Sequence, residues 1–324
     1  MEQYDVTALG ELLIDFTEYG KSGQGNPILE ANPGGAPCNV LAMLTKLGKR
    51  TAFLGKVGTD MFGDQLESAL KETGIATTGL IRDKNVHTTL AFVHKKADGD
   101  REFSFCRNLG ADMMLSETDL NEDLLTNCKI FHYGSLSMTH ETCWKATQKA
   151  IAIAEKQNAI LSFDPNLREP LWDNLEHARK QIAYGMEHCQ ILKISDNELQ
   201  WFTGETDFDA GIATLKKTYD IPLILLSMGK DGSRAYTKDT RMECAAYTQK
   251  NITDTTGAGD TFCACILNYI LEHGIKEFSE QELLEMLTFA NAAASLVTTK
   301  KGALRVMPDK TEIETLIQKG RITA

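Results

Sequence analysis

Asp254-Thr-Thr-Gly-Ala-Gly-Asp260 is a glycine-rich segment that leads directly into an amphipathic helix. Apolar residues from Phe262 to Ile270 recur after it with helical spacing, and Gly274 predicts where the helix ends. Backbone N–H groups at a glycine-rich helix start have no partner within the helix, and the helix dipole adds partial positive charge there. The segment therefore predicts an anion-binding site.

Asp260 directly follows the second of the two glycines, so the predicted anion site has a carboxylate beside it. A bound phosphate would repel this carboxylate, and its presence there needs a chemical reason. Removal of a proton from a hydroxyl that attacks the phosphate is such a reason. We therefore favour phosphoryl transfer to an alcohol over the alternative, an ordinary capped helix preceded by a flexible turn.

The composition limits the class of protein. The chain has 324 residues, of which 42% are hydrophobic, and this length allows one large α/β domain or two ordinary ones. The net charge is -11 and no long Lys/Arg block occurs, which argues against nucleic acid or an anionic membrane as a partner. No apolar run approaches the ~18–20 residues of a membrane span.

The N-terminus and the cysteines favour a cytoplasmic protein. The first five residues are acidic and lack the hydrophobic core of a signal peptide. The eight cysteines are scattered, and the spacing of the close pair Cys263 and Cys265 suits neither zinc nor a redox motif. We therefore expect reduced, buried cysteines.

Short apolar runs alternate with helical patterns along most of the chain. The predicted strands cover 5–10, 51–57, 130–133, 159–164, 191–194 and 222–226, and the predicted helices cover 39–47, 63–73, 141–156, 175–189, 209–219, 260–273 and 281–297. This order indicates βαβ units in a doubly wound, mostly parallel sheet flanked by helices. Ligands of such sheets bind outside the carboxyl ends of the strands. No repeat or linker divides the chain, so we expect a single domain over 1–324.

Two segments, 11–33 and 88–107, interrupt this alternation. The stretches 88–94 and 101–107 are both strand-like, and Asp98-Gly99 between them is a turn signal, so they predict a hairpin. The residues from 11 to 29 indicate an extended strand and loop. We expect a small antiparallel β lid that excludes water from the site, the alternative being an edge hairpin with no moving role.

A second glycine-rich helix start lies near the N-terminus. Gly34 and Gly35 let a small ligand approach the backbone closely, and Asn39 offers both a donor and an acceptor to a sugar hydroxyl. The carboxylate of Asp15, just past the first strand, can accept hydrogen bonds from two hydroxyls. Taken alone, Asn39 could be a helix cap and Asp15 a solvated loop residue. Two such helix starts at strand ends nevertheless predict two ligands held face to face.

Further candidates follow later strands. Arg168, in Asp164-Pro-Asn-Leu-Arg168, is placed to clamp a phosphate or sugar oxygen, unless it is a solvated turn residue. Ser227, Gly229 and Gly232 suit close approach to a nucleotide, or else a tight turn. Glu198 is of the type that holds Mg²⁺ through water. The chain has neither G-x-x-x-x-G-K-[ST] nor G-x-G-x-x-G after its first strand, which argues against P-loop NTPases and typical Rossmann dehydrogenases.

With these motifs the chain resembles the ribokinase-like (PfkB) carbohydrate kinases along essentially its whole length. The 254–260 motif is highly specific, and the segment 34–39 with the downstream glycines at 48 and 58 matches the other signature of the family. Within the family, the segments 164–168, 170–172 and 299–303 are similar to fructokinases. The resemblance implies an ATP-dependent kinase whose sugar is fructose.

The resemblance also assigns roles to individual residues. It implies that Asp260 is the catalytic base and that Arg168 lies near the sugar or the transferred phosphate. The amides that form the anion hole would be those of Gly257, Ala258 and Gly259. The sugar would be bound by Asp15, Gly34, Gly35, Asn39, Phe105 and Asn166. The nucleotide would be bound by Lys193, Glu198, Ser227, Gly229, Gly232 and Asn291.

The metal ions follow from the same resemblance. Mg²⁺ would be held by Glu198 through water, and Asp254 and Gly302 fall where some members bind a monovalent cation, often K⁺. Ser195 stands where the N-x-x-E motif of the family usually has Asn, so we expect an altered network of Mg²⁺ and water. Ala36, followed by proline, replaces the Lys-Gly pair of ribokinases, which argues against ribose.

Several alternatives stay open at this stage. Other kinases of the family act on 2-keto-3-deoxygluconate, ribose or nucleosides, and Arg168 could equally serve the carboxylate of an acidic sugar. A catalytically silent sugar- or nucleotide-binding protein on the same fold is a further alternative, against which Asp260 argues. Phe103 and Phe105 could cover the sugar or pack against the lid of a second subunit, which would make a homodimer through the β lid.

Overall fold

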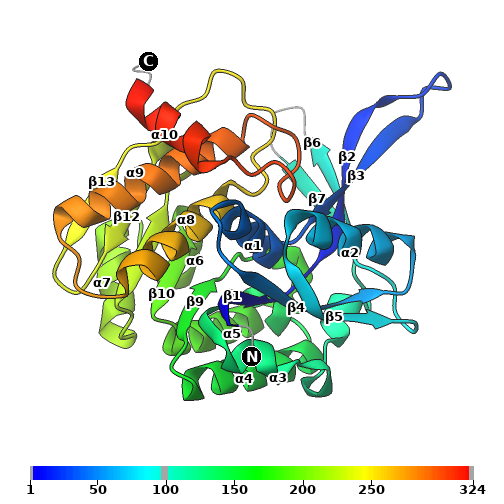
Figure 1. Ribbon diagram of the computed structural model, residues 1–324, viewed down its shortest axis with the longest axis horizontal. Coiled ribbons are helices and arrows are strands. Elements are labelled where there is room, and N and C mark those ends of the chain that lie inside the picture. Colours follow the sequence, from blue (N-terminus) through cyan, green and yellow to red (C-terminus); the bar gives the residue numbers. More distant parts are fainter. Residues whose placement is uncertain (1–2, 96–100, 321–324) are drawn as a thin grey trace.

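A nine-stranded sheet runs through the centre of the molecule in the computed structural model, which describes residues 3–95 and 101–320 (Figure 1). Its strand order is β13-β12-β11-β10-β9-β8-β1-β4-β5, with parallel pairing from β11 to β5 and antiparallel pairing of β12 and β13. The strands are β1 Tyr4–Leu9, β4 Thr51–Gly58, β5 Ala76–Asp83, β8 Cys128–Gly134, β9 Ile160–Asp164, β10 Ile191–Ser195, β11 Leu223–Ser227, β12 Ser233–Tyr236 and β13 Arg241–Cys244. The predicted doubly wound, mostly parallel sheet is confirmed.

Helices cover both faces of this sheet, and each face has its own hydrophobic core. The first core involves α1 Ala36–Lys46, α2 Met61–Thr73, α8 Ala258–His273, α9 Glu280–Val297 and α10 Lys310–Lys319. The second involves α3 Glu122–Thr126, α4 Glu141–Lys156, α5 Leu175–His188, α6 Asp196–Thr203 and α7 Phe208–Thr218. Short 3₁₀ turns lie at η1 Ala111–Met114, η2 Glu117–Asp119, η3 Ser135–Met138, η4 Glu169–Leu171 and η5 Gly229–Asp231.

The direction in which the chain adds strands reverses beside β1. From β1 the chain moves to β4 and β5 on one side, and it then returns to place β8 on the other side of β1. The loops after β1 and β8 therefore diverge, which opens a crevice at the carboxyl ends of the strands. The glycine-rich starts of α1 and α8 lie at this same crevice.

The smaller sheet has the order β3-β2-β6-β7 and projects from the body in Figure 1. It consists of β2 Leu13–Lys21, β3 Pro27–Gly34, β6 Leu90–Lys95 and β7 Arg101–Cys106. The pairs β2–β3 and β6–β7 are antiparallel, as predicted for the 88–107 hairpin, and β2 pairs with β6 in parallel. The predicted turn at Asp98-Gly99 and the side chain of Phe103 lie outside the described part of the chain.

Several elements differ from the sequence-based expectation. Helix α1 begins at Ala36, three residues earlier than expected, because Pro37 fits the first turn of a helix. The predicted strand and loop from 11 to 29 is part of a strand pair that extends to Gly34. The strands β5, β12 and β13 and the helices α3, α6 and α10 were not expected. Most of β5 is only half-buried and has no clean alternation, so its sequence carries a weak strand signal.

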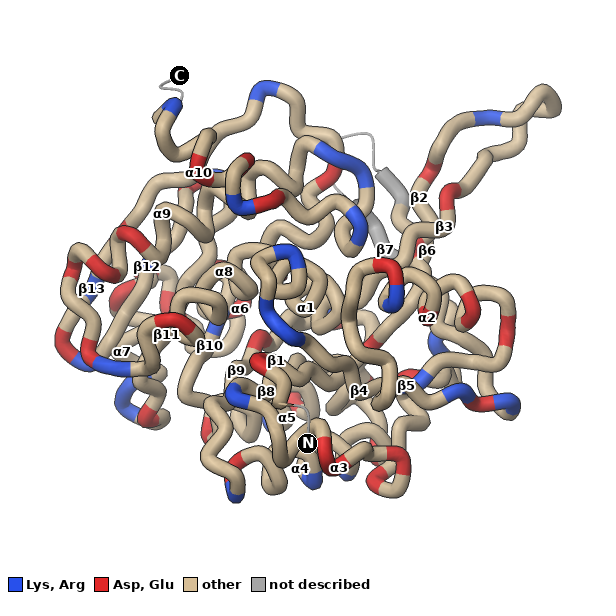
Figure 2. The backbone as a smooth tube through the Cα atoms, viewed as in Figure 1, with Lys and Arg blue, Asp and Glu red and all other residues tan. Residues whose placement is uncertain are grey.

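Charged side chains are spread over the whole chain rather than gathered in one region. In Figure 2 acidic and basic residues intersperse over the body, whereas most of the projecting β2–β3 pair is uncharged. Within residues 3–95 and 101–320, no helix combines the length and the apolar character needed to cross a membrane.

Truncation of Leu41 tests the packing of α1 against the body. Leu41 is fully buried in the first core, so Leu41→Ala should lower the free energy of unfolding by about 2–5 kcal/mol. Leu175→Ala, at a position 41% exposed, is the matched control and should change it by less than about 0.5 kcal/mol. Urea denaturation followed by circular dichroism measures both, and equal effects would contradict this description of the core.

Candidate active site

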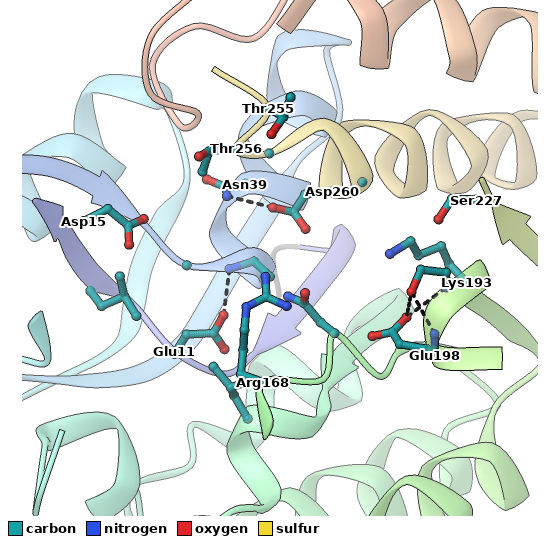
Figure 3. A pocket seen from close by; sticks show the side chains of 18 of the residues that line it. Glu11, Asp15, Asn39, Arg168, Lys193, Glu198, Ser227, Thr255, Thr256 and Asp260 are labelled. Atoms are coloured by element: carbon teal, nitrogen blue, oxygen red, sulfur yellow. Dashed lines mark hydrogen bonds between the residues drawn. The ribbon is translucent and has the colours of Figure 1, made fainter. Parts of the chain in front are cut away.

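A cavity of about 470 Å³ lies where the carboxyl ends of the strands, the starts of α1 and α8 and the small sheet meet (Figure 3). Most of the residues expected from the sequence line it. They are Asp15, Gly35, Asn39, Phe105, Asn166, Arg168, Lys193, Glu198, Ser227, Gly229, Gly257, Gly259 and Asp260. The tertiary structure therefore brings together residues that are up to 245 positions apart, from Asp15 to Asp260.

Asp260 lies in the first turn of α8 and faces the cavity. Asn39, in α1, donates a hydrogen bond of 2.8 Å from Nδ2 to Asp260 Oδ2. Burial raises the pKa of Asp260, and the Asn39 hydrogen bond and the charges of Lys193 and Arg168 limit this rise. The carboxylate is thus oriented by a neutral donor, which leaves it able to accept a proton.

The backbone around Gly257 is a concave turn that requires glycine. Gly257 has φ 79°, and a Cβ there would lie 2.7 Å from Cβ of Ala303. A Cβ on Gly259 would lie 3.3 Å from Nζ of Lys193. The amide of Ala258 donates a long hydrogen bond of 3.3 Å to the carbonyl of Thr255, whereas among the described residues no protein acceptor is bonded to the amides of Gly257 and Gly259. Two N–H groups and a nearby ammonium can therefore receive an anion.

The side of the cavity formed by β2 and the start of α1 has groups suited to hydroxyls. Gly34 makes room for Asp15, because a Cβ on Gly34 would lie 2.3 Å from Asp15 Oδ2. Asn39 is only 3% exposed, and its Oδ1 is buried without a hydrogen-bond partner in the described residues. A buried amide oxygen of this kind needs a donor, and a ligand hydroxyl can supply one.

Lys193, in the middle of β10, forms a buried ion pair with Asp164 at the end of β9. Nζ of Lys193 lies 2.9 Å from Oδ2 of Asp164, and both side chains are more than nine-tenths buried. Burial raises the pKa of Asp164 to about 6, although Lys193 opposes the rise. Burial works against the charge on Lys193, but Asp164 and Glu198 hold its pKa above the usual range.

Glu198 and Ser195 form a capping box at the start of α6. Glu198 accepts hydrogen bonds from Ser195 N (2.8 Å), Ser195 Oγ (2.7 Å) and Leu167 N (2.7 Å). Burial alone would raise the pKa of Glu198, but Lys193 and these hydrogen bonds hold it below the usual range. The ionised carboxylate is thus fixed on two strand-end loops, and Ser195, which takes the place of the expected Asn, is itself one of its donors.

A few residues expected at the site lie elsewhere. Asn291 bonds to Ser233 and to the carbonyls of Cys244 and Ala245, and Gly232 packs against the same segment. Neither lines the cavity, and the absence of a Cβ on Gly232, which would lie 2.2 Å from the carbonyl oxygen of Cys244, lets this segment pack closely.

Asp254 and Gly302 lie beside a second cavity, of about 380 Å³, which Asp254 lines together with Lys301 and residues of β2. Asp254 Oδ2 accepts a hydrogen bond of 3.1 Å from Gly302 N, and its Oδ1 accepts from Thr256. Asp254 therefore ties the loop before α8 to the loop after α9.

Glu11 is a residue of the site that the sequence reasoning missed. It follows β1 by two positions, lines the cavity and is 5% exposed. The available signal was its place, because a carboxylate at the carboxyl end of the first strand lies at the ligand-binding edge of such a sheet.

Comparison with known proteins identifies the family to which the chain belongs. The model of the pfkB family carbohydrate kinases matches residues 3–310. The chain belongs to this family.

A probable fructokinase-2 of Arabidopsis thaliana is 43% identical over 310 residues, which are 95% of this chain and 94% of that protein. The crystal structure of a Xylella fastidiosa fructokinase with bound ATP has a TM-score of 0.88 and 29% identity, and the match covers 98% of this chain and 99% of that one. A Vibrio cholerae fructokinase double mutant with fructose, ADP and potassium ion has a TM-score of 0.84 and 26% identity, over 98% and 99% of the two chains. The fold and family of this carbohydrate kinase agree with the expectation from its sequence.

Removal of the Lys193 ammonium should destabilise the kinase in a pH-dependent way. Lys193→Met leaves the buried Asp164 carboxylate unpaired, which should lower the free energy of unfolding by about 3 kcal/mol at pH 8. The pKa of Asp164 is already raised to about 6 and should rise further without Lys193. At pH 5 Asp164 should then be protonated, so the loss should be smaller there than at pH 8.

Urea denaturation of the wild type and the variant at both pH values measures this loss. The double variant Lys193→Met/Asp164→Asn is the control, since removal of both charges should restore part of the stability at pH 8. An equal loss at pH 5 and pH 8 would contradict the ion-pair account.

Proposed function

We propose that this sugar kinase transfers the γ-phosphate of ATP to a hydroxyl of fructose, with Asp260 as the base. The observation that carries the proposal is the 2.8 Å hydrogen bond from Asn39 to Asp260, which joins the two glycine-rich helix starts at one point. A hydroxyl held by α1 and a phosphate held at α8 would meet at this carboxylate. The fructokinase names of the relatives support fructose as the acceptor.

The chemistry then follows from the positions of the polar groups. Asp260 accepts the proton of the hydroxyl as its oxygen forms a bond to the γ-phosphorus, and the bond from this phosphorus to the bridging oxygen of ADP breaks. The amides of Gly257 and Gly259 stabilise the charge on the transferred group, with Arg168 on the other side of the cavity. Base catalysis of this kind contributes roughly 10²–10⁴-fold in rate.

The two ends of the cavity divide the substrates between them. We place the sugar among Asp15, Gly35, Asn39, Phe105 and Asn166, where the unpartnered Oδ1 of Asn39 supports a hydroxyl donor. We place the phosphates of ATP along the α8 start toward Ser227 and Gly229, with Lys193 beside them.

Asn291 and Gly232, which lie outside this cavity, would contribute by holding the β12–β13 segment beside the nucleotide.

Glu198 fits a Mg²⁺ ion held through water. Its ionised carboxylate lines the cavity, but both oxygens already accept hydrogen bonds from the protein. Mg²⁺ retains most of its water and is usually held by one or two carboxylates together with substrate phosphates. When bound, the ion would neutralise charge on the phosphates, while Glu198 orients its water ligands.

We extend the proposal to a monovalent cation, such as K⁺, near Asp254 and Gly302. Asp254 is buried, and its carboxylate already joins the two loops beside the start of α8. A cation there would add to the order of the turn that carries Gly257. The Vibrio cholerae relative was crystallised with a potassium ion.

The small sheet is proposed to act as a lid on a single-domain enzyme of the cytoplasm. Phe105 of β7 lines the cavity, so closure of the sheet would exclude water from the sugar. All eight cysteines are free, which supports a reducing compartment, and Cys106 is exposed rather than buried as expected.

Replacement of Asp260 tests the catalytic role. Asp260→Asn should lower kcat by about 10²–10⁴-fold, while the affinity for sugar and the fold stay nearly unchanged. Because the pKa of Asp260 is raised, activity of the wild type should fall as the pH drops through that raised pKa, and this acid limb should vanish in Asp260→Asn. A coupled assay of ADP release across pH measures both.

The same assay tests the choice of sugar. Wild-type protein is offered fructose, ribose, 2-keto-3-deoxygluconate and adenosine with ATP and Mg²⁺, with and without K⁺. Preference for a sugar other than fructose would replace the acceptor but retain the reaction, whereas no transfer to any of them would favour a silent binding protein. Near wild-type activity of folded Asp260→Asn would remove the base from the mechanism.

We also propose a homodimer through the β lid. Tyr19 is 71% exposed, and Ile28 and Leu29 are 43% and 42% exposed on the projecting β2–β3 pair. Leu29→Asp should convert a dimer into a monomer in size-exclusion chromatography with light scattering, because a charge would be buried at the interface. Leu175→Asp, on α5, is the matched control and should stay dimeric. A monomeric wild type would contradict the proposal.

A further inference from the structure

Glu11 is a buried carboxylate in the cavity that the proposed mechanism does not use. It is 5% exposed and lines the part of the cavity that also holds Asp15 and Arg168. Figure 3 shows its carboxylate beneath the start of α1, at the Asp15 end of the cavity and away from Ser227. A charge buried in this way is costly unless it has partners, so its contacts should reveal what it does.

One oxygen of Glu11 completes the start of α1. Oε1 accepts a hydrogen bond of 2.7 Å from the backbone N–H of Ala36, the first residue of the helix. This N–H is one of those at a helix start that have no partner within the helix, and Glu11 supplies its acceptor from a distant part of the chain. A Cβ on Gly35 would lie 2.3 Å from the carbonyl oxygen of Glu11, which shows how closely the two segments pack.

The Glu11 carboxylate has few donors within the protein. Within the described residues, Ala36 is the one other residue that donates a hydrogen bond to it, and the second donor is the backbone amide of Glu11 itself. The nearby cation, Arg107, uses its donors on Asp112, Thr139 and the carbonyl of Leu136. Burial raises the pKa of Glu11 to about 7. The charge of Asp112 adds to this rise, whereas Arg107 and the backbone amides of Glu11 and Ala36 oppose it.

The carboxylate therefore has unused acceptor capacity on the wall of the sugar subsite. A sugar hydroxyl is a donor of the right kind, and above pH 7, where Glu11 is mostly ionised, its hydrogen bond to a hydroxyl is stronger than one between neutral groups. A sugar acid would instead bring its own negative charge toward Glu11 and Asp15.

We propose that Glu11 is a specificity-determining residue, which accepts a hydroxyl of a neutral sugar on Oε2 while Oε1 holds the start of α1. This inference rests on the proposed function, since it concerns the same sugar site. Two carboxylates at one end of the subsite favour a neutral polyol and oppose an acidic sugar, so the site selects partly by repulsion. Because Glu11 also fixes α1, it positions Gly35 and Asn39 for the same ligand.

Glu11→Gln separates the two functions, because an amide oxygen can still accept from Ala36 while the charge is lost. We expect KM for fructose to rise about 10-fold or more in Glu11→Gln and up to about 100-fold in Glu11→Ala, with KM for ATP within about 2-fold of wild type. The ratio of kcat/KM for fructose to that for 2-keto-3-deoxygluconate should fall about 10-fold in Glu11→Gln. Glu141→Gln, on the exposed start of α4, is the matched control and should change neither quantity.

Several outcomes would overturn the proposal. Glu11→Gln with the KM for fructose and the selectivity of wild type would show that Oε2 has no contact with the sugar. A lowered Tm with equal changes in KM for sugar and ATP would show a purely structural residue. The panel of sugars offered to wild type tests the proposed function separately: if another neutral sugar is preferred, the Glu11 comparison is made on that sugar, and preference for the sugar acid would overturn both.

Discussion

The hydrogen bond from Asn39 to Asp260 is the contact on which the arrangement of the site depends. It joins the first turns of α1 and α8, which are 221 residues apart in the chain. Each of these helices opens with glycines whose backbone can approach a ligand, and each lies on the same face of the central sheet. The bond therefore fixes the distance between the two helix starts at which we propose that the sugar hydroxyl and the phosphate bind.

The charges around this bond balance in a way that suits the proposed role of Asp260 as a base. Burial raises the pKa of Asp260, yet Lys193 and Arg168 limit the rise, so the carboxylate can be ionised and still accept a proton. Lys193 in turn stays charged because Asp164 and Glu198 lie beside it. The ion pair with Asp164 thus positions an ammonium beside Gly259 at the end of two adjacent strands. The central sheet supplies rigid positions for these groups, which the loops alone would not.

Much of this protein could be predicted from local patterns. The alternation of apolar runs and helical periodicity gave the parallel sheet, because the strands β4, β9, β10 and β11 are almost wholly buried and mostly apolar. The glycine-rich segments predicted that a helix follows each of them, although α1 begins three residues earlier than expected, since few other residues tolerate a φ like that of Gly257. The short helix α6 was missed, although its Ser195–Glu198 capping box can be recognised in the sequence.

The sequence by itself determined the two helix starts, the carboxylate at Asp260 and the family, because each of these depends on residues that are close together in the chain. The tertiary structure decided which residues share the cavity. It placed Asn291 and Gly232 against the β12–β13 segment instead, and it brought Glu11 to the amide of Ala36, 25 residues away. Such contacts depend on the order of the strands in the sheet, which reverses beside β1. A local sequence pattern does not show which distant segments this order brings together.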